Sequence, residues 1–141
     1  AYDVVVVDAG SEQDNATLSL LELVDEPIIV SRMGLTSLSS TNYILELCKQ
    51  FSPILADKVK LVVNRYSSKA IIEKSEIEKI AHKDIFAEIA EDNEKPLAAI
   101  NRGLPLMMAY PHSSSSKGIR AIAKKLIEPE NKMVRKSFFG I

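Results

Sequence analysis

Four consecutive valines, Val4 to Val7, lead directly into Asp8 near the start of the sequence. An uninterrupted run of β-branched residues is typical of a strand covered on both faces of a parallel sheet. Asp8 would then lie at the carboxyl end of that strand, where open α/β sheets bind ligands. An Asp there can also simply form a turn, but Gly10 would let the backbone approach a ligand closely. The run therefore predicts an α/β fold with an acidic ligand position at one sheet edge.

Composition narrows the class of protein further. The 141 residues, 46% of them apolar, suffice for one globular domain, and the formal net charge of -1 gives no reason to expect a specific nucleic-acid partner. The apolar stretches are too short to span a bilayer. The single cysteine, Cys48, shares a helical face with Ile44 and Phe51, which indicates a reduced, buried thiol. We therefore expect a cytoplasmic protein.

Apolar runs between breakers alternate with stretches of helical period, the pattern of a mostly parallel sheet flanked by helices. The expected strands are Asp3 to Asp8, Pro27 to Ser31, Val59 to Asn64 and Ile85 to Ile89. The expected helices lie around Leu18 to Val24, Leu38 to Phe51, Ile77 to Ala81, Glu94 to Arg102 and Ile119 to Leu126. Thr36 or Ser37 would cap the second helix, and Gly103 followed by Pro105 would stop the fourth. The segment from Ser67 to Lys74 shows no regular period and is expected to be irregular. We interpret residues 1–127 as domain and 128–141 as a tail.

Asn64, Arg65 and Tyr66 follow the third expected strand and form the second candidate site. The amide of Asn64 can donate and accept hydrogen bonds at once, which suits the edge of a purine, and the plane of Arg65 or Tyr66 can stack on a base. A turn-forming Asn followed by surface residues would have the same letters. We therefore take these residues as candidates beside Asp8 and Gly10.

The position of Asp8 is that of a Walker B aspartate, which holds the magnesium ion of a bound nucleotide. The phosphate loop that accompanies such an aspartate, G-x-x-x-x-G-K-[ST], does not occur in the sequence. Ser116, Lys117 and Gly118 carry similar letters in the wrong order and are interpreted as loop and helix cap. His82 and His112 have no metal-ligand spacing. The sequence thus contains a magnesium half-site without its phosphate half, as expected of the back portion of a longer protein.

These segments, in this order, resemble the back half of the MinD/ParA group, the deviant Walker A P-loop ATPases. The resemblance runs from Asp3 to Gly10, through Val59 to Tyr66, to a segment with Asn101, Gly103 and Pro105. That last pattern is similar to the pilus-assembly ATPases called CpaE or TadZ. The chain is therefore identified as resembling the C-terminal half of a MinD/ParA-type ATPase, most of all of the CpaE/TadZ kind.

The resemblance implies a P-loop NTPase-like, mostly parallel sheet flanked by helices, present here as its C-terminal portion. It also implies ATP and Mg²⁺ as cofactors of the intact protein. Asp8 would hold Mg²⁺ through water, Gly10 would belong to the switch segment, Asn64 and Arg65 would flank the adenine, and Ala87 to Asp92 could line the base or ribose. The intact protein would be an ATPase and homodimer that positions a pilus or secretion machine, whereas these residues alone are not expected to hydrolyse ATP.

Other interpretations remain to be compared. Ala9 stands where the group usually has a proline, which favours a second interpretation, a non-catalytic dimerisation module that retains the fold. A phosphorylation receiver domain is disfavoured because Val59 to Asn64 ends in an amide and not in a phosphate-accepting Asp. A Rossmann dehydrogenase is disfavoured because no G-x-G-x-x-G follows a strand.

Two further expectations concern surfaces. Lys132 to Ile141 mixes basic and apolar residues and, if helical, resembles the amphipathic membrane anchor of MinD-type proteins, which would give a peripheral contact at the inner face of the membrane. A frayed end, or one packed on a neighbouring chain, would explain the same letters. Without a phosphate-loop strand beside it, the strand from Asp3 to Asp8 would have an open edge, so we expect self-association through that edge or a strand swap.

Overall fold

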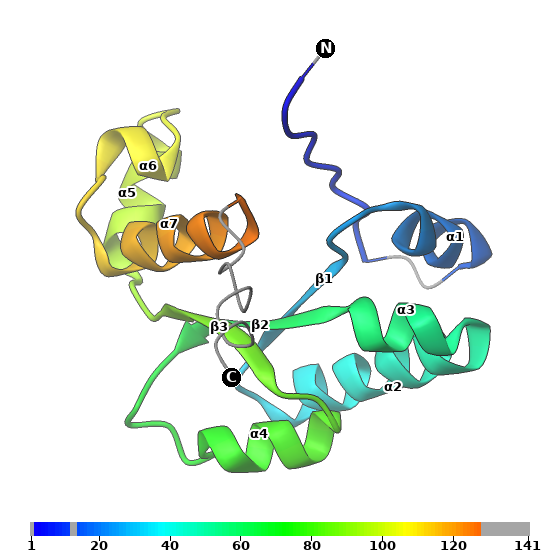
Figure 1. The fold of residues 1–141 in the computed structure, drawn as a ribbon. Coiled ribbons are helices and arrows are strands. Elements are labelled where there is room, and N and C mark those ends of the chain that lie inside the picture. The colour runs from blue at the N-terminus through cyan, green and yellow to red at the C-terminus, as the bar shows by residue number, and fades with distance from the viewer. Residues whose placement is uncertain (1, 12–13, 128–141) are drawn as a thin grey trace, which may run out of the picture. The chain divides into compact units, whose positions relative to one another are not determined.

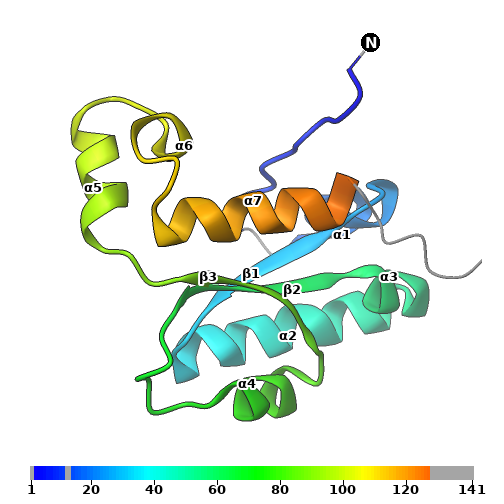
Figure 2. The same cartoon turned by 60° about the vertical axis from the view of Figure 1, so that its left-hand side comes forward.

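The core of the fold is a parallel sheet in the order β1-β2-β3, seen in Figures 1 and 2. The structure is a computed structural model, and it describes residues 2–11 and 14–127. The strands of these residues are β1 (Ile28–Arg32), β2 (Lys60–Tyr66) and β3 (Ile85–Ala90). Three expected strands are thus confirmed, and the mostly parallel sheet with them. The central part of β2, Leu61 to Val63, is at most 1% exposed, as its neighbours on both sides require.

The chain divides into two compact units, Ala1–Glu91 and Asp92–Ile141. The helices of the first are α1 (Asn15–Leu23), α2 (Leu35–Phe51), α3 (Pro53–Lys58) and α4 (Lys74–Ala81), and those of the second are α5 (Glu94–Asn101), α6 (Leu106–Ala109) and α7 (Ser114–Ile127). The five expected helices are confirmed. The sequence did not predict α3 and α6, since six and four residues are too few to show a helical period. Among the described helices, none is long and apolar enough to cross a membrane.

Helices and strands of the first unit share two apolar clusters. Leu18 of α1, Leu45 of α2 and Leu55 of α3 pack with Ile29 and Leu61 of the sheet. Leu38 of α2, Val63 of β2 and Ile77 of α4 form the second cluster, and all three are completely buried. The helices therefore hold the strands in place by burying apolar surface against them.

The prediction of a buried thiol is confirmed, because Cys48 has no exposed surface and its burial raises the pKa of the thiol. The expectation that Phe51 is buried on the same face is wrong. Its side chain is 42% exposed because Phe51 is the last residue of α2. The predicted cap of α2 is also wrong. The helix begins after Gly34, whose carbonyl accepts from Leu38 N–H at 2.9 Å, so Thr36 and Ser37 already lie inside the first turn.

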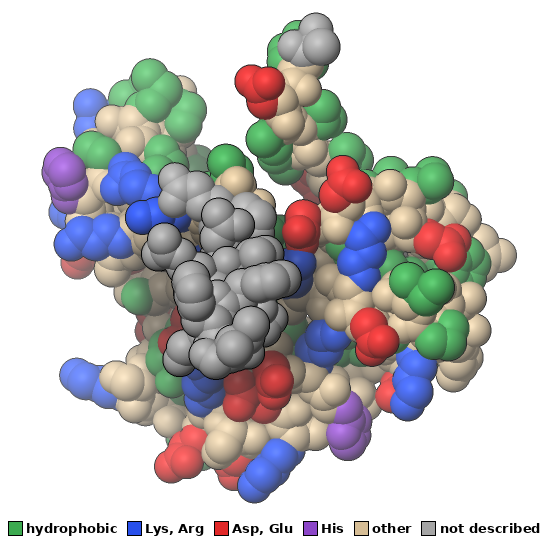
Figure 3. Space-filling view, in the orientation of Figure 1, with side chains coloured by type: hydrophobic (Ala, Val, Ile, Leu, Met, Phe, Trp, Pro, Cys, Tyr) green, Lys and Arg blue, Asp and Glu red, His purple; other side chains and the backbone are tan. Residues whose placement is uncertain are grey.

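The segment from Asp3 to Asp8 does not form the expected strand. Its valines, Val4 to Val7, are 52% to 90% exposed, and no strand of the described residues pairs with them. Figure 3 shows hydrophobic side chains on the surface of this N-terminal segment. A strand needs a neighbour for its backbone groups, and β-propensity alone does not supply one.

In the second unit, α5 ends as the sequence indicated, at a glycine followed by a proline. Gly103 has a φ of 62°, its N–H donates to Ile100 at 2.9 Å, and Leu104 N–H donates to Ala99 at 3.0 Å. A left-handed residue with this bonding is a standard helix stop that favours glycine. Within the unit, the Lys95 ammonium lies 5.4 Å from the centre of the ring of Tyr110.

Candidate functional site

The carboxyl ends of β2 and β3 lie side by side, and this brings the Asn64 segment next to the end of β3. The register pairs Asn64 with Ile89 and then Tyr66 with Ala90, so that Arg65 has no counterpart on β3. An extra residue of this kind is a β-bulge, which bends a strand and changes the direction of its side chains. The predicted adenine-flanking residues therefore occupy an irregular turn at the carboxyl edge of the sheet, next to the segment that was expected to line the same ligand.

Arg65 adopts a left-handed backbone conformation, with a φ of 55°. This region is uncommon for residues other than glycine, and it costs on the order of 1 kcal/mol or more. The Arg65 N–H donates to Oδ1 of Asn64 at 2.8 Å, which holds the turn. Asn64 is half-buried and Arg65 is exposed. With its oxygen already accepting this bond, the amide of Asn64 offers N–H donors to a ligand, and Arg65 adds a planar cation beside it.

Asp8 and Gly10 form a local turn. Oδ1 of Asp8 accepts from Gly10 N–H at 3.0 Å, and Gly10 has a φ of 69°, where glycine is favoured. Both residues are exposed, in the segment that forms no strand. The described residues therefore do not bring Asp8 to the carboxyl edge of the sheet, and its role as a magnesium position stays a prediction. No group of three His, Cys, Asp or Glu suited to a metal ion occurs in the described parts of the chain.

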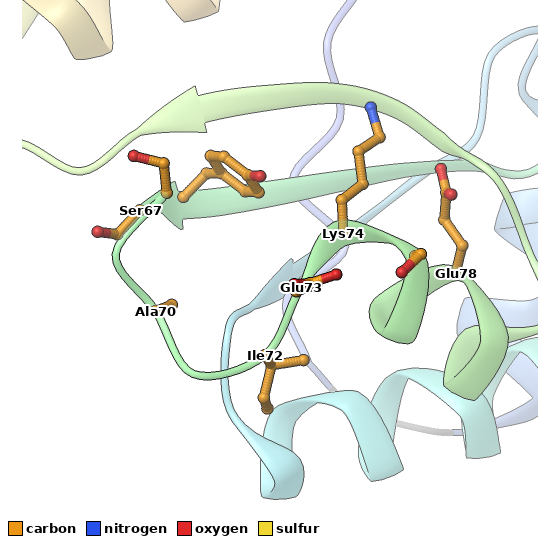
Figure 4. A pocket seen from close by; sticks show the side chains of 9 residues that line it. Ser67, Ala70, Ile72, Glu73, Lys74 and Glu78 are labelled. Atoms are coloured by element: carbon orange, nitrogen blue, oxygen red, sulfur yellow. The ribbon is translucent and has the colours of Figure 1, made fainter.

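A cavity of about 500 Å³ lies between the end of β2 and α4 (Figure 4). Serines, ionisable side chains and a tyrosine dominate its wall. The lining residues are Tyr66, Ser67, Ser68, Ala70, Ile72, Glu73, Lys74, Ser75 and Glu78. Asn64 and Arg65 do not line it, so the cavity adjoins the predicted site through Tyr66 alone. The sequence indicated only an irregular segment here, and no motif in it signalled a cavity.

Lys74, at the start of α4, forms an ion pair with Glu88 of β3. Its Nζ lies 2.8 Å from Oε1 of Glu88, and this hydrogen bond raises the pKa of Lys74 above its usual value. Glu78 of the same helix accepts from Ile85 N–H at 3.0 Å. These two contacts attach α4 to β3 and fix one wall of the cavity. Sequence reasoning missed them because each contact joins α4 to the strand that follows it, and no local period in the sequence predicts such a pairing.

The weaker sequence candidates are placed elsewhere. His82 ends α4 in a left-handed conformation, with a φ of 49°. Ser116, with no exposed surface, and Lys117 lie in the first turn of α7, and Ser113 Oγ accepts from Ser116 N–H at 3.1 Å. The interpretation of Ser116, Lys117 and Gly118 as loop and helix cap is therefore wrong, because all three lie inside α7 and the capping hydroxyl belongs to Ser113, just before the helix.

Parallel strands joined by helices, with polar residues at the carboxyl edge, form a partial P-loop NTPase-like α/β fold. The chain is similar to the crystal structure of a ParA family ATPase from Chlorobium tepidum TLS, with 30% sequence identity and a TM-score of 0.71. The chain therefore has a ParA/MinD-like fold. No protein-family model and no curated protein matches it.

The alignment with that ATPase covers 79% of this chain but 46% of the other. The chain thus spans less than half the length of the ParA family ATPase. The likeness extends over most of the elements described here and defines the fold that they form.

Proposed function

We propose that this chain supplies the C-terminal part of a MinD/ParA-like, ATP-binding switch protein. The observation that carries the proposal is the Asn64 and Arg65 bulge at the carboxyl edge, in a fold similar to that of a ParA family ATPase. The N–H donors of Asn64 suit the ring nitrogens of adenine, and the Arg65 guanidinium can stack on the base. Residues 87–92, next along the edge, would line the base or ribose.

Asp8 is the proposed Walker B aspartate. One of its oxygens accepts from Gly10, and the carboxylate is exposed, so it can bind the water shell of Mg²⁺. For this role the segment that carries Asp8 has to join the sheet. The phosphate loop, absent from this sequence, would come from the remainder of a longer parent protein, and we expect these 141 residues alone not to hydrolyse ATP.

The proposed client is a Tad/Flp pilus or another secretion machine, as in CpaE and TadZ proteins. The assignment rests on the sequence pattern of Asn101, Gly103 and Pro105, which forms the end of α5 and the turn after it. ATP would drive formation of a homodimer in the cytoplasm. Lys132 to Ile141, which lies outside the described residues, would add a peripheral contact with the membrane.

A second candidate function is a non-catalytic dimerisation or interaction module. The observation in its favour is Ala9, which stands directly after Asp8 where the ATPases usually have proline. In that case the fold would persist without nucleotide-dependent switching. The two functions differ in whether the intact protein binds ATP.

The test is a titration with a fluorescent ATP analogue and Mg²⁺, on this chain and on the longest form that its gene encodes. We expect only the long form to bind the analogue. In that form, Asn64→Ala and Asp8→Ala should each weaken binding about tenfold or more, because the first removes a contact with the base and the second a charge-assisted contact. Gln50→Ala and Asp84→Ala are the matched controls, since both side chains are exposed and distant from the carboxyl edge. A long form that binds no nucleotide would favour the interaction module.

A further inference from the structure

The regular alternation of backbone groups along β2 breaks at Arg65. Lys60 N–H donates to the Pro27 carbonyl at 2.9 Å, so Lys60 faces β1, and in a parallel ladder every second residue after it does the same. This alternation would turn Tyr66 toward β1 as well. The Tyr66 carbonyl instead accepts from Glu91 N–H at 2.8 Å, on the side of β3. The extra residue at Arg65 has therefore reversed the direction of the backbone groups that follow it.

The reversal turns the N–H of Ser67 toward β1, which has already ended at Arg32. A tight turn follows β1, in which Gly34 N–H donates to the Arg32 carbonyl at 3.0 Å. The central residue of that turn is Met33, and its Sδ accepts from Ser67 N–H at 3.1 Å. An N–H turned inward without a partner is costly, so the thioether supplies the acceptor that the strand no longer offers.

Packing holds the side chain of Met33 in place for this bond. Met33 is partly buried against the second apolar cluster, and Tyr66 packs against the same cluster. The sulfur of Met33 ties the end of β1 to the residue after Tyr66, while the Tyr66 carbonyl ties the same turn to the segment after β3. The carboxyl ends of all three strands are thus joined directly behind the bulge of Asn64 and Arg65.

We propose that Met33 is a positioning residue for nucleotide binding, whose thioether holds Asn64 and Arg65 in the orientation that reads adenine. This role rests on the proposed function of those two residues. Met33 acts through Ser67 and needs no contact with the nucleotide itself. Because the bond fixes the turn beside the base and not the phosphate loop, its loss should weaken recognition of the base and spare that of the phosphates.

The first test measures the contact itself in the 141-residue chain without nucleotide. Met33→Leu keeps a side chain of similar volume and removes the acceptor, so amide hydrogen exchange at Ser67 should become about tenfold faster or more. Met33→Gln offers an amide oxygen at a similar reach and should restore slow exchange. The amide of Val62, in the regular part of β2, is the internal reference. Equal exchange at Ser67 in the parent and in Met33→Leu would overturn the contact.

The second test uses the long form and compares the fluorescent ATP analogue with inorganic triphosphate, each with Mg²⁺. Met33→Leu should weaken binding of the analogue about fivefold or more and leave binding of triphosphate unchanged, because triphosphate has no base. Met33→Gln should bind the analogue as the parent does. Met108→Leu is the matched control, since Met108 is 73% exposed and lies on α6. Equal weakening toward both ligands would mean a general structural loss and would overturn the positioning role.

The same measurements separate the role of Met33 from the function on which it rests. If the parent long form and Met33→Leu bind the analogue equally well, the proposed function stands and the positioning role falls. A parent long form without affinity for the analogue would overturn both, whatever the exchange at Ser67.

Discussion

The hydroxyl oxygens of Ser31 on β1 and Thr41 on α2 lie 2.8 Å apart, and both residues are buried. This hydrogen bond joins a strand to the helix that follows it. Thr41→Val should lower the free energy of unfolding by about 1–3 kcal/mol, because it leaves the Ser31 hydroxyl without this partner in an apolar setting. Urea unfolding measures the change. Adding Ser31→Ala to Thr41→Val should recover part of the lost free energy of unfolding. A double variant whose loss exceeds the sum of the two single losses would contradict this account.

The ion pair of Lys74 and Glu88 predicts a dependence on alkaline pH. Because the folded-state pKa of Lys74 is raised, its contribution is fully present below the unfolded pKa of about 10.4 and is lost as the pH rises through the folded value. The lysine side chain is 48% exposed, so the contribution should not exceed about 1 kcal/mol. Lys74→Met should be less stable than the parent chain near pH 8 and equally stable near pH 12. A difference that is constant with pH would rule out this cause.

Leu38 is the central residue of the second apolar cluster, completely buried against Val63 and Ile77. Leu38→Ala should cost about 2–5 kcal/mol, since it removes apolar contacts and leaves a cavity. Leu35→Ala on the same helix is the control. Because Leu35 is 69% exposed, this substitution should change the free energy of unfolding by no more than about 0.5 kcal/mol. Equal losses for both variants in urea unfolding would mean that this cluster does not hold α2.

Arg65 allows backbone strain and ligand binding to be separated. Arg65→Gly should leave the free energy of unfolding unchanged or slightly raised, because glycine adopts a φ of 55° without steric cost. Arg65→Val should lower it by about 1 kcal/mol or more, since β-branched residues fit this conformation poorly. In the long form both variants should lose affinity for the ATP analogue. Unchanged affinity in Arg65→Gly would remove the guanidinium from the proposed site.

Local sequence was sufficient for most of the elements. The strand around Val62 and the long helix around Leu45 could be predicted because burial in a layered α/β fold imposes a period on the chain. The stop at Gly103 was also readable, since glycine is favoured where a helix ends in a left-handed residue. The neighbourhood of Asn64 and the end of β3 was implied by the resemblance to MinD/ParA-type ATPases, which puts both segments beside the same ligand, and the register of β2 and β3 agrees with it. Their roles toward a ligand remain predictions.

The tertiary structure alone decided the features that depend on distant partners. The valines before Asp8 have the composition of a strand but form none, because a strand exists only where a second backbone completes its hydrogen bonds. The register shift at Arg65 and the contact of Lys74 with Glu88 create the bulge and the cavity wall, and no local pattern encodes either. Sequence determined which segments favour helix or strand through local propensity and burial period. Pairing and cavity shape were decided by long-range packing, which brings together residues that the sequence separates.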